Sequence, residues 1–151
     1  MNDEFWMTQA LSLAETAKSL GEVPVGALIV KDNSMISTGF NTRELACDPL
    51  GHAEMSAIMA ATRSLGSWRL NDCSLYVTLE PCLMCAGALY QSRISKVFFG
   101  AYDSKAGALK SLYNIHEDTR LNHRFEVIGG ILEKECSSII SAFFRNKRQQ
   151  K

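Results

Sequence analysis

The sequence predicts an α/β protein with a three-layer α/β/α arrangement, in which helices cover both faces of one mixed sheet. Segments with apolar residues at helical spacing alternate with short apolar runs that are typical of buried strands. The first two of these runs are separated only by a polar turn, which predicts an antiparallel hairpin. Later runs are separated by helices, which predicts parallel neighbours. The 151 residues suit one domain spanning residues 1–151.

The first third of the chain is expected to form a helix and a hairpin. Apolar side chains recur at helical spacing over residues 4–20, and Gly21 is a helix stop. Apolar runs at 23–30 and 35–40 flank the polar turn Lys-Asp-Asn-Ser, so both are expected to be strands. Residues 41–51 contain several turn formers and are expected to be irregular.

The middle of the chain is expected to alternate helices and strands. Alanines repeat on one face of residues 52–65, which predicts a second helix that ends before a glycine. Apolar runs predict strands at 74–79 and 96–101. The helix expected between them, at 81–92, begins with a proline, a residue well suited to the first helical position.

The last third begins with a long polar segment. Residues 102–123 are expected to form a loop, and its length indicates a function. A weak fifth strand is expected at 124–129, and apolar side chains from Cys136 to Phe144 predict a final amphipathic helix. Residues 141–151 contain four basic and no acidic side chains. Such an end can contact phosphates, or it can simply be a solvated helix end.

The composition favours a cytoplasmic protein with no membrane partner. Five cysteines without regular spacing argue against the disulfide framework of a small secreted protein. The N-terminus has acidic residues before its apolar ones, unlike a signal peptide. No apolar stretch approaches the roughly 18 residues of a membrane span. The formal net charge is zero, so charge alone does not indicate a nucleic-acid partner.

The motif "TLEPCLMC" predicts two metal ligands, Cys82 and Cys85. Residues three apart on the first turn of a helix are neighbours, so both sulfurs can reach one ion, and a helix start favours the thiolate form that binds metal. "HAE" supplies His52 at the start of another helix, and two helix starts can meet at one edge of the sheet. Three protein ligands with an open fourth position are typical of catalytic zinc.

Each part of this pattern has other interpretations when taken alone. Cys-x-x-Cys can be a redox pair or a structural zinc site, or it can occur by chance. Cys47 is the only plausible fourth ligand, since Cys73 is expected at the far end of a strand and Cys136 on the apolar face of the last helix.

Glu54 is the candidate general base. Positions two apart do not share a helix face, so both His52 and Glu54 can approach one ion only if His52 lies at the helix cap. A carboxylate beside the open position can take a proton from water and pass it on. The order His-x-Glu followed by Pro-Cys-x-x-Cys is the signature of zinc deaminases, which act on bases taken out of the stack.

These motifs resemble the zinc-dependent cytidine deaminase superfamily, and the finer pattern is similar to the bacterial tRNA-specific adenosine deaminases. The finer pattern consists of "EVPVGALIV", "NTRE", "CAGALYQSRI", "FGAYDSKAGA", "NHR" and "FFR", and it extends nearly from end to end. The resemblance implies a cytidine deaminase-like fold with a five-stranded sheet, one zinc ion per chain and a homodimer.

The resemblance also implies the reaction and the partner. Adenosine at the wobble position of an arginine tRNA anticodon loop becomes inosine through a zinc-activated hydroxide, and Glu54 carries protons to the ring nitrogen and to the departing ammonia. The partner is therefore a tRNA anticodon stem-loop, whose loop bases are already partly unstacked.

Several positions match residues that line the RNA site of that family. The matching residues are Asn41, Arg43, Arg69, Asp103, Lys105, Asn122, Phe144 and Arg148. Without the resemblance, these residues have other interpretations. Asn41 can equally well be a turn residue, and Asp103 and Lys105 can belong to a solvated loop surface. Phe144 can be part of the core. The sequence departs from the family before the histidine, where "DPLGHAE" contains Leu50 and Gly51 in place of threonine and alanine.

Two other functions fit parts of the pattern. A deaminase of free cytidine, cytosine or guanine would have the same zinc ligands. A binding module in which zinc only stabilises the fold would leave Glu54 as a surface carboxylate.

Overall fold

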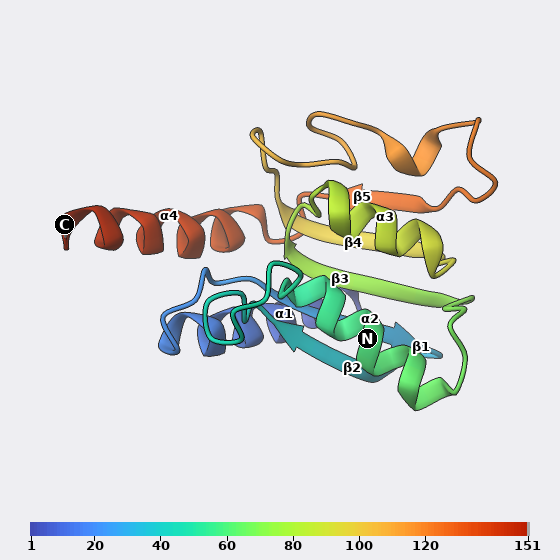
Figure 1. Ribbon diagram of the computed structural model, residues 1–151, viewed down its shortest axis with the longest axis horizontal. Helices are drawn as coiled ribbons and strands as arrows, with labels where there is room; N and C mark the ends of the chain where they lie inside the picture. The colour runs from blue at the N-terminus through green and yellow to red at the C-terminus, as the bar shows by residue number, and fades with distance from the viewer. Residues whose placement is uncertain (151) are drawn as a thin grey trace.

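The computed structural model describes residues 1–150, which form one mixed five-stranded sheet with helices on both faces (Figure 1). The α-helices are Asp3–Ser19 (α1), Ala53–Leu65 (α2), Leu83–Gln91 (α3) and Glu133–Gln149 (α4). The strands are Gly26–Lys31 (β1), Ser34–Phe40 (β2), Cys73–Leu79 (β3), Lys96–Ala101 (β4) and Glu126–Gly129 (β5). A short 3-10 helix, η1, spans Ile115–Glu117. The predicted fold class is confirmed.

The strand order is β2-β1-β3-β4-β5. The hairpin pair β1–β2 is antiparallel, and the pairs β3–β4 and β4–β5 are parallel, as expected. The expectation of parallel neighbours is wrong for the connection through α2. This helix joins β2 to β3, but β1 lies between those two strands and pairs with β3 in the antiparallel sense. The hairpin turns the chain outward, so α2 must cross over β1 to reach the middle of the sheet.

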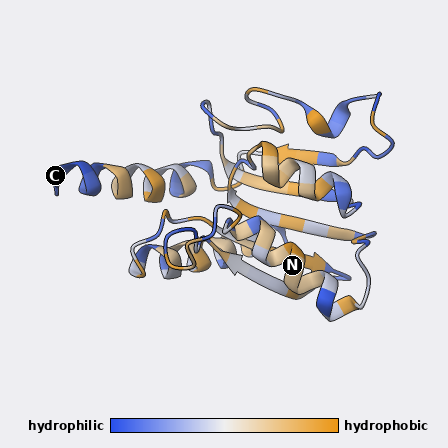
Figure 2. Ribbon diagram, viewed as in Figure 1, coloured by the Kyte–Doolittle hydropathy of each residue, from blue (hydrophilic) through white to orange (hydrophobic). Residues whose placement is uncertain are grey.

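The two faces of the sheet bury alternate residues of the same strands. Ile29 and Val77 lie in the core under α2 and α3. Their neighbours Leu28 and Tyr76 lie in the core under α1 and the first turns of α4. Successive side chains of a strand point to opposite faces, so each central strand contributes side chains to both cores. The strands show hydrophobic bands separated by paler ones (Figure 2).

The start of α2 lies directly on the sheet at Gly39. Any Cβ at Gly39 would overlap the carbonyl oxygen of Ala53, so only glycine allows this close approach. The N-cap of α2 is His52, with an extended backbone at φ −90° and ψ 149°. Because Gly39 lets the start of α2 lie this close to β2, it helps determine the position of His52, the residue just before the helix.

The start of α3 differs by two residues from the sequence expectation. Pro81 precedes the helix, Cys82 is its N-cap with φ −77° and ψ 179°, and the helix begins at Leu83. The backbone of Cys82 is still extended as the chain leaves β3, so only Cys85 lies within the first turn. Both helix starts nevertheless meet at the same edge of the sheet (Figure 1).

None of the helices within residues 1–150 is both long enough and apolar enough to span a bilayer.

Candidate metal centre and substrate cavity

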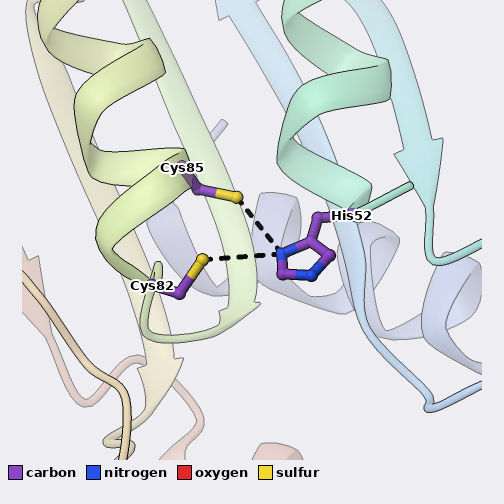
Figure 3. A group of neighbouring side chains, drawn as sticks. All are labelled: His52, Cys82 and Cys85. Atoms are coloured by element: carbon purple, nitrogen blue, oxygen red, sulfur yellow. Dashed lines mark hydrogen bonds between the residues drawn. The ribbon is translucent and has the colours of Figure 1, made fainter. Parts of the chain in front are cut away.

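Three side chains from the two helix starts converge on one point. The Nδ1 atom of His52 lies 3.6 Å from the Sγ atom of Cys82 and 3.4 Å from the Sγ atom of Cys85. The histidine faces both sulfurs across the gap between α2 and α3 (Figure 3). Among residues 1–150, these three form the only group of three or more His, Cys, Asp or Glu side chains whose donor atoms cluster closely enough to share an ion, all within 4.8 Å of one another.

The spacing of these donors fits a zinc ion. Zinc bonds of about 2.3 Å to sulfur and 2.0–2.1 Å to nitrogen, at the tetrahedral angle, separate the two donor atoms by about 3.6 Å. The observed separations of 3.6 and 3.4 Å agree with that value. Thiolate and imidazole donors are also the ones that zinc prefers in proteins.

The electrostatics of the cysteine pair also fit a cation. The Cys85 thiol and the His52 imidazole stabilise the Cys82 thiolate, and together they lower the pKa of Cys82 to about 3 despite burial. The same thiolate, together with burial, raises the pKa of Cys85 well above its usual range. Two adjacent thiolates repel each other, so the pair ionises fully only beside a positive charge.

The remaining cysteines lie outside this cluster. Cys47 is exposed, and its thiol donates a hydrogen bond to the carbonyl of Glu44 at 3.8 Å. Cys73 and Cys136 are buried in the two cores, on opposite faces of the sheet. The donor set therefore consists of three residues, and Cys47 is not part of it.

Glu54 lies beside the three candidate metal ligands, in the first turn of α2. Its side chain is buried, with 4% of its surface exposed, and it lines the same cavity as His52 and Cys82. Burial is the largest influence on its carboxyl group and raises its pKa to about 7. Because His52 is the helix cap, as expected, both residues can face the same point although they are two apart in the sequence.

A cavity of about 220 Å³ opens next to this cluster. Two of the candidate ligands, His52 and Cys82, line it, together with four more of the predicted site residues: Asn41, Arg43, Glu54 and Asp103. Asn41 is buried, and within residues 1–150 its Oδ1 atom has no hydrogen-bond partner. A buried polar atom without a partner is costly, so Asn41 is suited to bind a ligand in the cavity.

A broader groove of about 790 Å³ adjoins the cavity. Its walls include Asp103, Lys105, Phe144 and Arg148, and both hollows share Asp103. Phe144 is 41% exposed, so its helical spacing does not reflect burial in the core. The helix α4 projects beyond the sheet, and its far end is hydrophilic (Figures 1 and 2).

Two predicted RNA contacts lie apart from both hollows. The guanidinium group of Arg69 is placed over the ring of Trp68, 4.5 Å from its centroid. Asn122 accepts a hydrogen bond of 2.6 Å from the hydroxyl of Tyr90. Neither side chain lines the cavity or the groove, and contact with RNA stays a prediction for both.

Several residues of the cavity wall were not predicted as site residues from the sequence, among them Glu22, Glu80 and Lys147. The two glutamates are almost fully buried, at 1% and 2% exposed. Burial opposes ionisation of Glu80, but hydrogen bonds from the Ser111 hydroxyl and from backbone N–H groups outweigh it and lower the pKa of the carboxyl group. Glu22 and Glu80 lie within the motifs "EVPVGALIV" and "TLEPCLMC", but no spacing in the sequence indicates their place in the wall.

Comparison with known proteins identifies the family. A model of the MafB19-like deaminase family matches residues 1–148. A tRNA-specific adenosine deaminase of Bacillus subtilis (strain 168) is 47% identical over 149 residues, which are 99% of this chain and 92% of that protein.

Two solved structures are also similar. One comes from work on A-to-I editing by tRNA:A34 deaminases at the wobble position of transfer RNA; it has a TM-score of 0.86 and 38% identity, and the match covers 89% of this chain and 98% of that one. The other is guanine deaminase from Bacillus subtilis, with a TM-score of 0.65 and 35% identity over 74% of this chain and 82% of that one.

These matches place the fold and the site among the deaminases. More narrowly, the chain belongs to the family of tRNA-specific adenosine deaminases, and the resemblance drawn from its motifs is confirmed.

Proposed function

We propose that this protein converts adenosine to inosine by hydrolytic deamination at the wobble position of a tRNA, with an arginine tRNA as substrate. The main support is the placement of Glu54, a buried carboxylate in a cavity beside three converging metal donors. The membership of the chain in a family of tRNA deaminases supports the choice of substrate.

His52, Cys82 and Cys85 would hold one zinc ion per chain, since their donor atoms have the spacing that zinc requires. When bound, zinc supplies a Lewis acid that makes water a nucleophile at neutral pH. The three side chains come from two helices that are packed against one sheet, so they are held in position before substrate arrives.

Glu54 moves the protons of the reaction. Its carboxylate takes a proton from the attacking water and delivers it to the ring nitrogen next to the carbon that bears the amino group. A second proton passes through the same carboxylate to the amino group, which leaves as ammonia. The net reaction consumes one water and releases one ammonia, and burial of Glu54 keeps bulk water from exchanging these protons.

The rest of the wall binds RNA. The free Oδ1 of Asn41 accepts a hydrogen bond from the target nucleotide in the cavity. In the groove, the exposed ring of Phe144 stacks on a neighbouring base, and Lys105 and Arg148 contact phosphates. An anticodon stem-loop suits these hollows, because loop bases can enter them without breaking base pairs.

The same proposal includes a homodimer and a cytoplasmic location. The side chains of Met59, Trp68 and Leu83, on or beside α2 and α3, are about half exposed, at 48%, 54% and 54%. A second copy of the chain would cover such apolar surface, which supports the dimer.

One other function has a specific observation in its favour. The structural likeness to a guanine deaminase extends over 74% of this chain, so deamination of a free base is the second candidate. It would use the same metal ligands and Glu54, but it would have no use for the groove along α4.

An assay with purified, zinc-loaded protein separates the two candidates. An anticodon stem-loop with adenosine at the wobble position is offered beside free guanine, cytosine and cytidine, and both inosine and ammonia are measured. We expect inosine in the stem-loop and no ammonia from the free compounds. Ammonia from a free base, with the stem-loop unchanged, would overturn the proposal.

A further inference from the structure

Glu80 is a buried carboxylate that has no part in the proton transfer proposed for Glu54. It lies between the last residue of β3 and Pro81, and only 2% of its surface is exposed. No ion pair within residues 1–150 includes it. A buried carboxylate without a cation is costly unless hydrogen bonds meet its charge, so the groups that surround it indicate its role.

Both oxygens of Glu80 accept hydrogen bonds from the segment 103–111. The Oε2 atom accepts from the backbone N–H groups of Leu109, Lys110 and Ser111, at 3.2, 2.8 and 2.9 Å. The Oε1 atom accepts from the N–H group of Asp103 at 3.0 Å and from the hydroxyl of Ser111. One carboxylate therefore fastens both ends of the segment.

This segment is the wall that the cavity and the groove share. Asp103 and Ala106 line both hollows, and Lys105 lines the groove. The segment also packs tightly on Glu80. Gly107 lies so close to the carboxylate that any Cβ at this position would overlap it. The wall has no helix or strand of its own. It is anchored to the core by Ala108 and Leu109, and Glu80 meets its backbone N–H groups on both sides of that anchor.

Glu22 holds a second loop in the same manner. Its side chain is 1% exposed, and its oxygens accept hydrogen bonds from the N–H groups of Glu44 at 3.1 Å and Leu45 at 2.6 Å. These residues belong to the loop at 41–51, which places Arg43 in the cavity wall. Two loops of the rim are therefore each held by a buried glutamate through backbone N–H groups.

We propose that Glu80 is a positioning residue for RNA binding, and that Glu22 has the same role for the other loop. The inference rests on the proposed function, since it takes the two hollows as the place where the target nucleotide and its neighbours bind. Glu80 fixes the wall that contacts RNA, whereas Glu54 moves protons. Loss of the Glu80 carboxylate therefore changes KM for the stem-loop far more than kcat.

The variant Glu80→Gln tests this assignment in the full-length, zinc-loaded protein. Glutamine keeps the size of the side chain but offers one acceptor oxygen and turns an NH₂ group toward N–H donors. We expect KM for the anticodon stem-loop to rise between about tenfold and a hundredfold, because small displacements of binding groups have effects of that size. We expect kcat at saturating RNA to stay within about threefold of the wild type, and zinc content to be unchanged.

Two further variants complete the experiment with Glu80→Gln: Ser111→Ala as a milder change and Glu126→Gln as a matched control. Ser111→Ala removes one of the five hydrogen bonds and leaves the carboxylate in place, so it answers the question even if Glu80→Gln does not fold. We expect it to raise KM about threefold. Glu126→Gln removes the same charge at an exposed site on β5, where the carboxylate is paired with Lys96, and we expect no change in KM.

The outcomes are distinct. A folded, zinc-loaded Glu80→Gln protein with unchanged KM overturns the inference, because a merely stabilising role would lower Tm and leave KM alone. If the wild type forms no inosine in the stem-loop, the proposed function fails instead. In that case, hydrogen exchange still tests whether Glu80 positions the loop. The amides of Leu109, Lys110 and Ser111 must exchange faster in Glu80→Gln than in the wild type. Equal exchange rates contradict the positioning role of Glu80.

Discussion

The cluster of candidate metal ligands and the rim of the cavity are built in different ways. The three donor residues of the cluster lie at the starts of α2 and α3, and both helices pack on the sheet. The rim consists of two loops and one face of α4, a helix that projects beyond the sheet. The cluster is held by regular secondary structure, whereas the loops are held by hydrogen bonds to the buried Glu22 and Glu80.

This difference separates chemistry from substrate choice. A donor set fixed by two helices and a sheet can stay the same while the loops around it change. The likeness to a guanine deaminase and to tRNA deaminases fits this division, since those proteins act on different substrates and share the fold. Changes in the centre should therefore abolish turnover, and changes in the rim should alter the affinity for RNA.

The largest effect is expected when a ligand is lost. Cys82→Ser should lose bound zinc, reduce deamination by about a thousandfold or more and lower Tm, because zinc binding also stabilises the two helix starts. Metal analysis, an inosine assay and thermal unfolding measure these changes. The matched control is Cys47→Ser, at an exposed cysteine outside the cluster, which should keep both zinc and activity. Retention of zinc by Cys82→Ser would contradict the assigned ligand set.

A smaller effect is expected on the rim. Arg148→Ala should raise KM for the stem-loop by about five- to tenfold and leave kcat nearly unchanged. It should also reduce the slope of log affinity against log salt concentration by about 0.7, which is the value for one phosphate contact on a single strand. Steady-state kinetics at several salt concentrations measure this. Lys134→Ala, in the first turn of the same helix, serves as the control and should leave the salt slope unchanged. A loss of kcat alone in Arg148→Ala would contradict a role in RNA binding.

The smallest effect is expected in the turn before His52. A Cβ at Gly51 would lie 3.0 Å from backbone atoms of Arg43, so alanine must displace the loop by a few tenths of an ångström. Alanine also restricts the unfolded chain, which is stabilising by about 0.4–1 kcal/mol. The two effects oppose each other, so Gly51→Ala should change the unfolding free energy by less than about 1 kcal/mol, as measured with denaturant. A larger loss would show that the loop cannot move.

The centre could be predicted from the sequence because its residues follow local rules. His52 and Cys82 are helix caps, and Cys85 is one turn further, so short motifs were enough to place all three on helix starts. The two-residue error at the start of α3 arose because proline suits the first helical position, whereas here the chain stays extended for two residues more. The course of α2 over β1 was missed because the sequence shows which elements follow each other, but not which strands pair.

The rim could be predicted only through resemblance, and only in part. The hydrogen bonds of Glu80 join residues 23 to 31 positions apart, so no local pattern indicates them. Phe144 has the spacing of a core residue, yet it is exposed because α4 extends beyond the sheet. Arg69 and Asn122 match the family pattern, but where they lie depends on loops that no spacing rule describes.

The most direct test of the catalytic centre uses Glu54→Gln. The amide keeps the shape of the side chain but cannot take up a proton, and it is not a metal ligand. Zinc content and inosine formation are measured on the same preparation as for the wild type. The account predicts one zinc ion per chain in both proteins and a loss of turnover of at least about a hundredfold in the variant. Turnover equal to that of the wild type, in a variant that still binds zinc, would contradict the role of Glu54 and with it the proposed chemistry.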